Sequence, residues 1–193
     1  MIPAFAVWIT GLPASGKSTI THVLVRELAA RGIDAAVLES DALRLVVTPH
    51  PTYTDEERET FYRTMTYIGA LLVRHGVSVI FDATGNRRAH RAAARAAIDR
   101  FIEVYVDCPL DVCIARDPKG LYRRAQSGET STLPGLQARY EAPEQPEVIV
   151  SGSGESVETA AGAIIRALQA KGYVRGDAPT RPSAIGDLSG GRR

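Results

Sequence analysis

The sequence predicts an α/β fold, a three-layer sandwich in which helices cover both faces of a parallel five-stranded sheet. Short apolar runs alternate along the chain with segments of helical periodicity, as expected when the strands of one sheet are joined by right-handed crossover helices. The first run, residues 5–10, is apolar almost throughout, which is typical of a strand buried on both faces. We therefore expect residues 1–174 to form one domain.

The individual elements follow from the same pattern. The helix after the first strand carries apolar residues at helical spacing and ends at Gly32, and the last helix begins near Val157 and closes at Gly172. Strands are predicted at residues 5–10, 35–40, 77–82, 102–107 and 148–151, and further helices at residues 56–75 and 88–100.

Two segments lack this alternation. Residues 116–145 carry Gly, Pro and many charges, with at most one helical turn near residues 121–125, and a loop of this length is usually functional or disordered. Residues 175–193 are rich in Gly, Pro, Ser and Arg, so they are predicted to be a disordered tail.

Composition and charge argue against several classes of protein. Lys and Arg total 23 against 22 for Asp and Glu, so the net charge of +1 gives no overall attraction to nucleic acid or to a membrane. No apolar run approaches the ~20 residues of a membrane-spanning helix, and the N-terminus lacks the features of a secretory signal. Cys108 and Cys113 are too few for a disulfide scaffold, so we expect buried thiols in a cytoplasmic protein. Four arginines are spaced as an exposed helix face, namely Arg87, Arg88, Arg91 and Arg95.

Residues 11–18, Gly-Leu-Pro-Ala-Ser-Gly-Lys-Ser, match the phosphate-binding loop pattern and lie between a strand and a helix, as that pattern requires. Glycines let successive backbone N–H groups curl around phosphate oxygens, and the helix N-terminus adds positive charge. Lys17 would neutralise the β- and γ-phosphates, and Ser18 would ligate Mg²⁺. The motif therefore indicates a P-loop NTPase-type fold with ATP and Mg²⁺ as cofactors, the alternative being a turn that merely joins strand to helix.

Two strands end in carboxylates at the sheet edge where α/β folds bind ligands. Asp41 could accept the proton of a hydroxyl or hold the Mg²⁺ shell through water, and the residues alone leave both roles open. Asp82 stands at the usual place of a second metal-associated acid, although Asp also commonly closes a turn there. The predicted metal ligands are Ser18, Asp41 and Asp82.

Basic residues are dense in the loop of residues 116–145. Such charge runs are often solvated surface. This loop, however, follows the fourth strand at the same sheet edge as the phosphate loop, so we favour a lid that closes over a triphosphate. The predicted nucleotide contacts are Gly11, Ala14, Ser15, Gly16, Lys17, Ser18, Thr19 and Arg116.

Three strings in the second half of the chain are highly specific. Residues 116–125 read Arg-Asp-Pro-Lys-Gly-Leu-Tyr-Arg-Arg-Ala, residues 140–143 read Tyr-Glu-Ala-Pro, and residues 104–110 read Val-Tyr-Val-Asp-Cys-Pro-Leu. With them, the sequence resembles the adenylylsulfate kinases, which use ATP to phosphorylate the ribose 3′-hydroxyl of adenylylsulfate, over most of residues 5–174. The resemblance implies a homodimer and a role in sulfate assimilation.

The resemblance also implies an acceptor site. Residues 39–44 correspond to the family's Asp-Gly-Asp-Asn-x-Arg, which gives catalytic and substrate roles to Asp41 and Arg44. Tyr53 resembles the aromatic residue that stacks on the substrate adenine, and Arg58 and Lys119 resemble the contacts to the substrate anion. Together with the phosphate-loop lysine, the predicted catalytic residues are Lys17, Asp41 and Lys119.

Three departures from the family fall in this acceptor pocket. Phe61 stands where the family has Asn, Leu133 stands where a Phe closes on the adenine, and residues 84–88 read Thr-Gly-Asn-Arg-Arg instead of Ile-Ser-Pro-Tyr-Arg. A base–aromatic stack contributes about 1–3 kcal/mol, so Leu133 is expected to weaken adenine selection roughly tenfold or more. The predicted substrate contacts are Arg44, Tyr53, Arg58, Phe61, Thr84, Lys119 and Leu133.

The leading expectation is an ATP- and Mg²⁺-dependent kinase that acts on a hydroxyl of adenylylsulfate or a related nucleotide. One alternative keeps the donor half and uses another small alcohol or a nucleotide diester as acceptor. A second alternative is a non-catalytic nucleotide-binding protein, against which Asp41, Asp82 and the basic loop argue.

Overall fold

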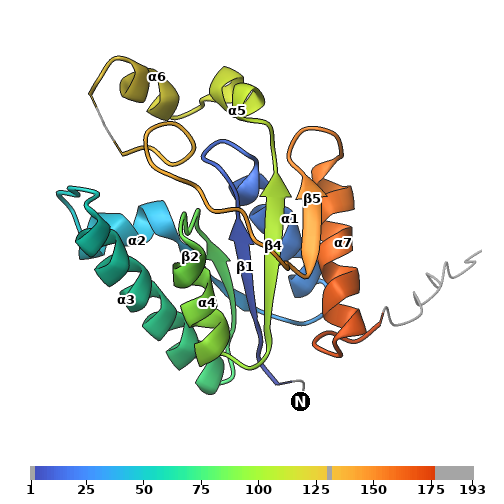
Figure 1. Cartoon of the computed structure of the whole chain (residues 1–193). Helices are drawn as coiled ribbons and strands as arrows, with labels where there is room; N and C mark the ends of the chain where they lie inside the picture. The colour runs from blue at the N-terminus through green and yellow to red at the C-terminus, as the bar shows by residue number, and fades with distance from the viewer. Residues whose placement is uncertain (1–2, 130–131, 177–193) are drawn as a thin grey trace, which may run out of the picture.

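The computed structural model describes residues 3–129 and 132–176, and it confirms the α/β sandwich (Figure 1). Five parallel strands form one sheet in the order β2-β3-β1-β4-β5. Strands β1 and β3 are buried along their whole length, as their unbroken apolar runs predict. The strands span Ala6–Thr10 (β1), Ala35–Glu39 (β2), Ser78–Asp82 (β3), Phe101–Asp107 (β4) and Val148–Ser151 (β5).

Four longer helices form the outer layers. α1 (Lys17–Ala29) and α7 (Val157–Ala170) pack on one face of the sheet, where Leu24 and Ile164 join the strands in one apolar cluster. α3 (Asp55–Arg74) and α4 (Arg88–Ala97) pack on the other face, where Phe61 and Met65 join a second cluster with Trp8. Each cluster buries large aliphatic or aromatic side chains, and this burial stabilises the sandwich.

Three short helices lie near the carboxyl edge of the sheet: α2 (Ser40–Val47), which directly follows β2, and α5 (Leu110–Arg116) and α6 (Leu121–Gln126), which lie above the sheet in Figure 1. The sequence pattern did not predict α2 or α5, because helices of eight and seven residues span only about two turns, too few to reveal a period. The expected helix at residues 88–100 ends earlier, at Ala97, because Ile98 adopts an extended conformation (φ −135°, ψ 106°) and is buried.

One of the four arginines that the spacing places on an exposed face is buried. Arg91 is only 2% exposed, and its Nε donates to Oε1 of Glu103 on β4 at 2.5 Å. Its terminal nitrogens donate to the backbone carbonyls of Gly85 and Glu141. The prediction is therefore wrong for Arg91, because a carboxylate on the neighbouring strand draws this side chain inward.

Three further expectations concern the chain as a whole. Among the described residues, no helix is long and apolar enough to span a membrane. Cys108 and Cys113 are free thiols and both are buried, as expected. The predicted tail lies, apart from its first two residues, outside the described part of the chain.

Candidate active site

The phosphate loop connects β1 to α1 at the carboxyl edge of the sheet, beside the end of β3. A Cβ atom at Gly11 would lie 2.7 Å from the carbonyl oxygen of Val106, so only glycine lets the loop pass this close to β4. Gly16 has a φ of 104° and leads directly into Lys17, the first residue of α1. The first turn of α1 holds no acidic side chain, so its positive end faces the loop uncompensated. The backbone therefore has the form of an anion cradle.

Lys17 is buried beneath this loop. Its Nζ donates to the backbone carbonyls of Gly11 at 3.1 Å and Leu12 at 2.8 Å. Burial lowers the pKa of Lys17, while the nearby carboxylates of Asp82 and Asp41 oppose that effect. Phosphate oxygens near Nζ would favour the charged form, so the ammonium is suited to meet a polyphosphate rather than bulk water.

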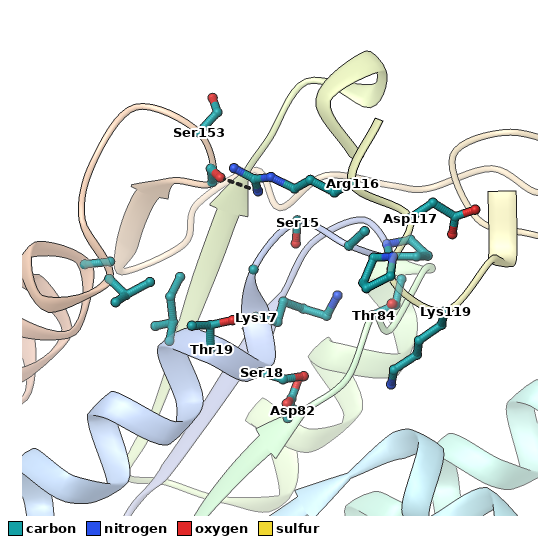
Figure 2. Close-up of a pocket in the computed structure, with 18 of the residues that line it drawn as sticks. Ser15, Lys17, Ser18, Thr19, Asp82, Thr84, Arg116, Asp117, Lys119 and Ser153 are labelled. Carbon is teal, nitrogen blue, oxygen red and sulfur yellow. Dashed lines mark hydrogen bonds between the residues drawn. The ribbon is translucent and has the colours of Figure 1, made fainter. Parts of the chain in front are cut away.

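A cavity of about 680 Å³ opens over the phosphate loop (Figure 2). Every predicted nucleotide contact except Gly11 lines it. Arg116 crosses its rim, where Nη1 donates to the carbonyl of Gly152 at 2.7 Å. Sequence reasoning missed the wall formed by residues 151–153 and 155–157, because small polar residues such as Ser153 and Ser156 form no motif there.

Two oxygen-bearing side chains in this cavity fit a divalent cation. Ser18 and Asp82 both face the space near Lys17 (Figure 2). Asp82 is 4% exposed, yet its carboxylate accepts no hydrogen bond from any residue in the described ranges. A buried carboxylate without donors is unfavourable, and Mg²⁺ prefers carboxylate, hydroxyl and water oxygens. The donor set therefore suits Mg²⁺.

Asp41 and Lys119 form an ion pair across the mouth of the cavity. Lys119 Nζ lies 2.6 Å from Oδ2 of Asp41 and 3.9 Å from Oε1 of Glu39. The hydrogen bond to Asp41 raises the pKa of Lys119. The pair joins the first turn of α2 to the segment between α5 and α6. These two parts of the chain are distant in sequence.

A second cavity, of about 380 Å³, adjoins the first. Asp41, Thr84 and Lys119 line both cavities, so the ion pair stands where the two meet. Arg44 of α2 and the segment that includes Leu133 form the far walls of the second cavity.

Arg58 and Tyr53 shape one wall of this second cavity. Arg58 Nε donates to the carbonyl of Tyr53 at 3.1 Å, and its Nη2 donates to the carbonyl of Thr132 at 2.7 Å. Tyr53 has a φ of 55°, which is strained for a residue other than glycine. Glu57 holds this turn, because its carboxylate accepts from the backbone N–H groups of Thr52 at 2.6 Å and Tyr53 at 3.3 Å. Arg58 therefore links the Tyr53 and Thr132 segments by hydrogen bonds, and it also places a cation beside the cavity.

The structure corrects the expected position of Phe61. Its side chain is fully buried and does not line the cavity. Its ring lies against Arg44, whose guanidinium carbon is 3.8 Å from the ring centroid. Leu133 does line the cavity, but it is only 8% exposed because it packs in the cluster around Cys113 and Tyr122.

The loop after β3 carries the third departure, and it is tightly held. The carbonyl of Thr84 accepts from Oγ1 of Thr10 at 2.5 Å, and the N–H of Gly85 donates to the hydroxyl of Tyr62 at 3.1 Å. A Cβ atom at Gly85 would lie 2.9 Å from the Trp8 ring, so glycine is required for this approach. Thr84 is thereby fixed at the boundary between the cavities.

A family model described as adenylylsulphate kinase matches residues 3–151, which is well over half of the chain. The chain belongs to the adenylylsulphate kinase family. An adenylyl-sulfate kinase from Synechococcus sp. (strain JA-2-3B'a(2-13)) is 39% identical over 168 residues, covering 87% of this chain and 96% of the relative. A probable adenylyl-sulfate kinase from Archaeoglobus fulgidus is 40% identical over 147 residues, covering 76% of this chain and 95% of the relative.

The structural comparison agrees with this family assignment. The APS kinase of Mycobacterium tuberculosis, solved in complex with AMPPNP and APS, superposes with a TM-score of 0.82 at 33% identity, covering 88% of this chain and 99% of that one. As an adenylylsulphate kinase family member, the chain is a kinase, which removes the non-catalytic nucleotide-binding alternative.

Proposed function

We propose that this chain transfers the γ-phosphoryl group of ATP to the 3′-hydroxyl of adenylylsulfate, with Mg²⁺ as cofactor. The observation that carries the proposal is the junction of the two cavities at Asp41, Thr84 and Lys119. A nucleotide triphosphate in the first cavity and an alcohol in the second would bring the reacting atoms together there. Proximity of this kind contributes much of the catalysis in phosphoryl transfer.

The donor half is supported by the geometry of the phosphate loop. Backbone N–H groups at the start of α1 and the Lys17 ammonium would bind the β- and γ-phosphates. Arg116 would close over the nucleotide from the segment after α5, within the proposed lid of residues 116–145. Ser18 and Asp82 would hold Mg²⁺, which would neutralise the negative charge that develops on the phosphates during transfer.

The acceptor half is supported by the charge of the second cavity. Four cationic side chains line it, Arg44, Arg58, Lys119 and Arg124, which suits a ligand with a phosphate–sulfate anhydride. The exposed part of the Tyr53 ring offers a face to a base.

Asp41 is the residue that would meet the acceptor hydroxyl. As the bond between the 3′-oxygen and the γ-phosphorus forms, the bond to the ADP oxygen breaks and the hydroxyl proton must leave. Asp41 would accept that proton, or would order the water shell of Mg²⁺; both roles are compatible with its place. Lys119 would exchange its 2.6 Å contact with Asp41 for the transferred phosphoryl group.

Several properties of this enzyme stay proposals from family membership. They are a cytoplasmic location, a homodimer, a role in sulfate assimilation, and a single domain over residues 1–174.

A different acceptor is the second candidate function, and Leu133 favours it. This side chain has no π face, and only a small part of it reaches the cavity. Adenine would therefore stack on Tyr53 alone, which leaves room for another small alcohol or a nucleotide diester.

Product analysis distinguishes the two candidates. The purified chain is incubated with ATP, Mg²⁺ and a panel containing adenylylsulfate, other nucleotides and simple alcohols, and product masses are identified. Adenylylsulfate should gain one phosphoryl group, and the Lys17→Ala variant should show no such product. Robust transfer to another alcohol, with none to adenylylsulfate, would replace the leading proposal by the second.

A further inference from the structure

We propose that Phe61 is a positioning residue of the acceptor site, which holds the guanidinium of Arg44 so that its unused N–H groups face the second cavity. This inference rests on the proposed function in one respect, namely that the second cavity receives the acceptor. Phe61 itself would not touch the ligand, because it is fully buried and absent from the cavity lining.

The contact between the two side chains is close and dry. The guanidinium carbon of Arg44 lies over the Phe61 ring at 3.8 Å from its centroid, and 5.0 Å from the centroid of Tyr53. Arg44 is 8% exposed and Phe61 is 0% exposed. A cation over an aromatic face is attracted by the ring quadrupole, and this attraction is strongest where water is excluded.

Hydrogen bonds hold Arg44 only weakly. Its Nη1 lies 3.4 Å from Oε1 of Glu57, which is long for a charge-assisted bond. The same carboxylate already accepts short bonds from the backbone N–H and hydroxyl of Thr52, both at 2.6 Å. Glu57 is thus committed mainly to the turn before α3, and the Phe61 ring supports the guanidinium by covering its face.

Within the described ranges, this arrangement engages only Nη1 among the donor nitrogens of Arg44. Its Nε and Nη2 donate to no residue in the described ranges, and Arg44 lines the second cavity. A stack uses the face of the guanidinium and leaves its edge N–H groups available for an anion. A hydrogen-bonding side chain at position 61 could instead compete for Arg44's donors.

The ring is itself rigidly supported. Phe61 and Tyr62 pack in a T-shaped pair at a centroid distance of 5.3 Å and an interplanar angle of 76°, and both belong to the apolar cluster around Met65. Phe61 and Glu57 stand one helical turn apart on α3, so both face the last turn of α2, where Arg44 lies. The orientation of Arg44 is therefore set by the packing of α3.

Steady-state kinetics of Phe61→Leu test this role. Loss of the ring face should raise the KM for adenylylsulfate by about three- to tenfold. The KM for ATP and the kcat should each change less than about twofold, because a positioning residue for the acceptor acts on neither. In the Arg44→Met background, adding Phe61→Leu should raise this KM no further.

Phe101→Leu is the matched control. Phe101 is 3% exposed, belongs to the same apolar cluster and lies under Arg95 at 5.0 Å, but it stands at the start of β4, away from the carboxyl edge. This variant should lose comparable stability and leave the KM for adenylylsulfate unchanged. An equal KM increase in both variants, or an undiminished effect in the Arg44→Met background, would overturn the inference.

A second readout does not depend on the acceptor. In a nuclear magnetic resonance spectrum of the free protein, the Phe61 ring current should shift the Arg44 Nε–H proton upfield. The Arg44 signal is identified as the one that disappears in the Arg44→Lys variant. Phe61→Leu should move the signal toward that of exposed arginines, whereas Phe101→Leu should not. An unmoved signal would overturn the inference. If the wild type phosphorylates no adenylylsulfate, the proposed function fails, and this spectrum alone decides the role of Phe61.

Discussion

Arg91→Met is expected to destabilise the fold strongly, because Arg91 places a charge inside the protein that only a few groups balance. Its Nε lies 2.5 Å from Oε1 of Glu103, and its Nη2 lies 2.6 Å from the carbonyl of Glu141. After the substitution, Glu103 would stay buried with Arg95 at 3.6 Å as its remaining cation. Removing one partner of a buried pair typically costs about 3–5 kcal/mol.

Urea and thermal unfolding followed by circular dichroism measure this effect. For a chain of this size we expect the melting temperature to fall by roughly 6–20 °C. The double variant Arg91→Met with Glu103→Leu removes both charges, so it should recover most of the lost stability. Arg95→Met should cost less than Arg91→Met, because the Arg95 side chain is 39% exposed, although it pairs with Glu147. A loss below about 1 kcal/mol for Arg91→Met alone would refute the assignment of a buried, interdependent pair.

Four further predictions concern the site and its surroundings. Lys17→Ala should lower kcat/KM by at least ~100-fold with an unchanged circular dichroism spectrum, and near-normal turnover would contradict the phosphate-loop assignment. Asp41→Asn should lower kcat far more than it weakens ATP binding, measured by kinetics beside ATP titration, and the reverse pattern would make Asp41 a ground-state contact. Burial lowers the pKa of His90 from 6.5 to about 4, so the unfolded chain takes up a proton first as the pH falls. Stability should therefore drop by about 3 kcal/mol between pH 6.5 and 4, and His90→Gln should remove this dependence; an unchanged slope of unfolding free energy against pH would count against it. Leu133→Phe should lower the KM for adenylylsulfate about fivefold and also lower the melting temperature by overpacking, whereas a raised KM would show that the added ring does not stack on the base.

The sheet could be predicted from the sequence because its strands are buried on both faces. An apolar run such as residues 5–10 indicates a strand buried on both faces. A segment of helical periodicity between two such runs indicates a helix that connects two parallel strands. Short elements at the sheet edge carry no comparable signal. α2 is eight residues long, and its apolar Leu45 and Val46 are largely exposed, so no stripe marks it.

The direction of a charged side chain could not be predicted from local spacing. Arg91 and its neighbours repeat at helical intervals, which is the pattern of a solvated face. Two carboxylates determine which side of α4 is covered, those of Glu103 on β4 and Glu147 before β5. The Glu147 carboxylate accepts a hydrogen bond from each terminal nitrogen of Arg95, both at 2.7 Å. These partners are 12 and 52 residues away, so only the assembled fold brings them together.

The donor and acceptor halves of the candidate site also differ in how far local sequence could predict them. In the strings that carry the family resemblance, Tyr122 donates its hydroxyl to the carbonyl of Pro13 at 3.0 Å, and the Tyr140 hydroxyl lies 3.1 Å from Oγ1 of Thr10. Both tyrosines therefore anchor the segment after β4 to β1 and the phosphate loop. The donor side could be predicted because the phosphate loop is a contiguous motif, residues 11–18. Phe61, by contrast, acts on the acceptor side through Arg44, and such a role becomes visible only when α2 packs on α3.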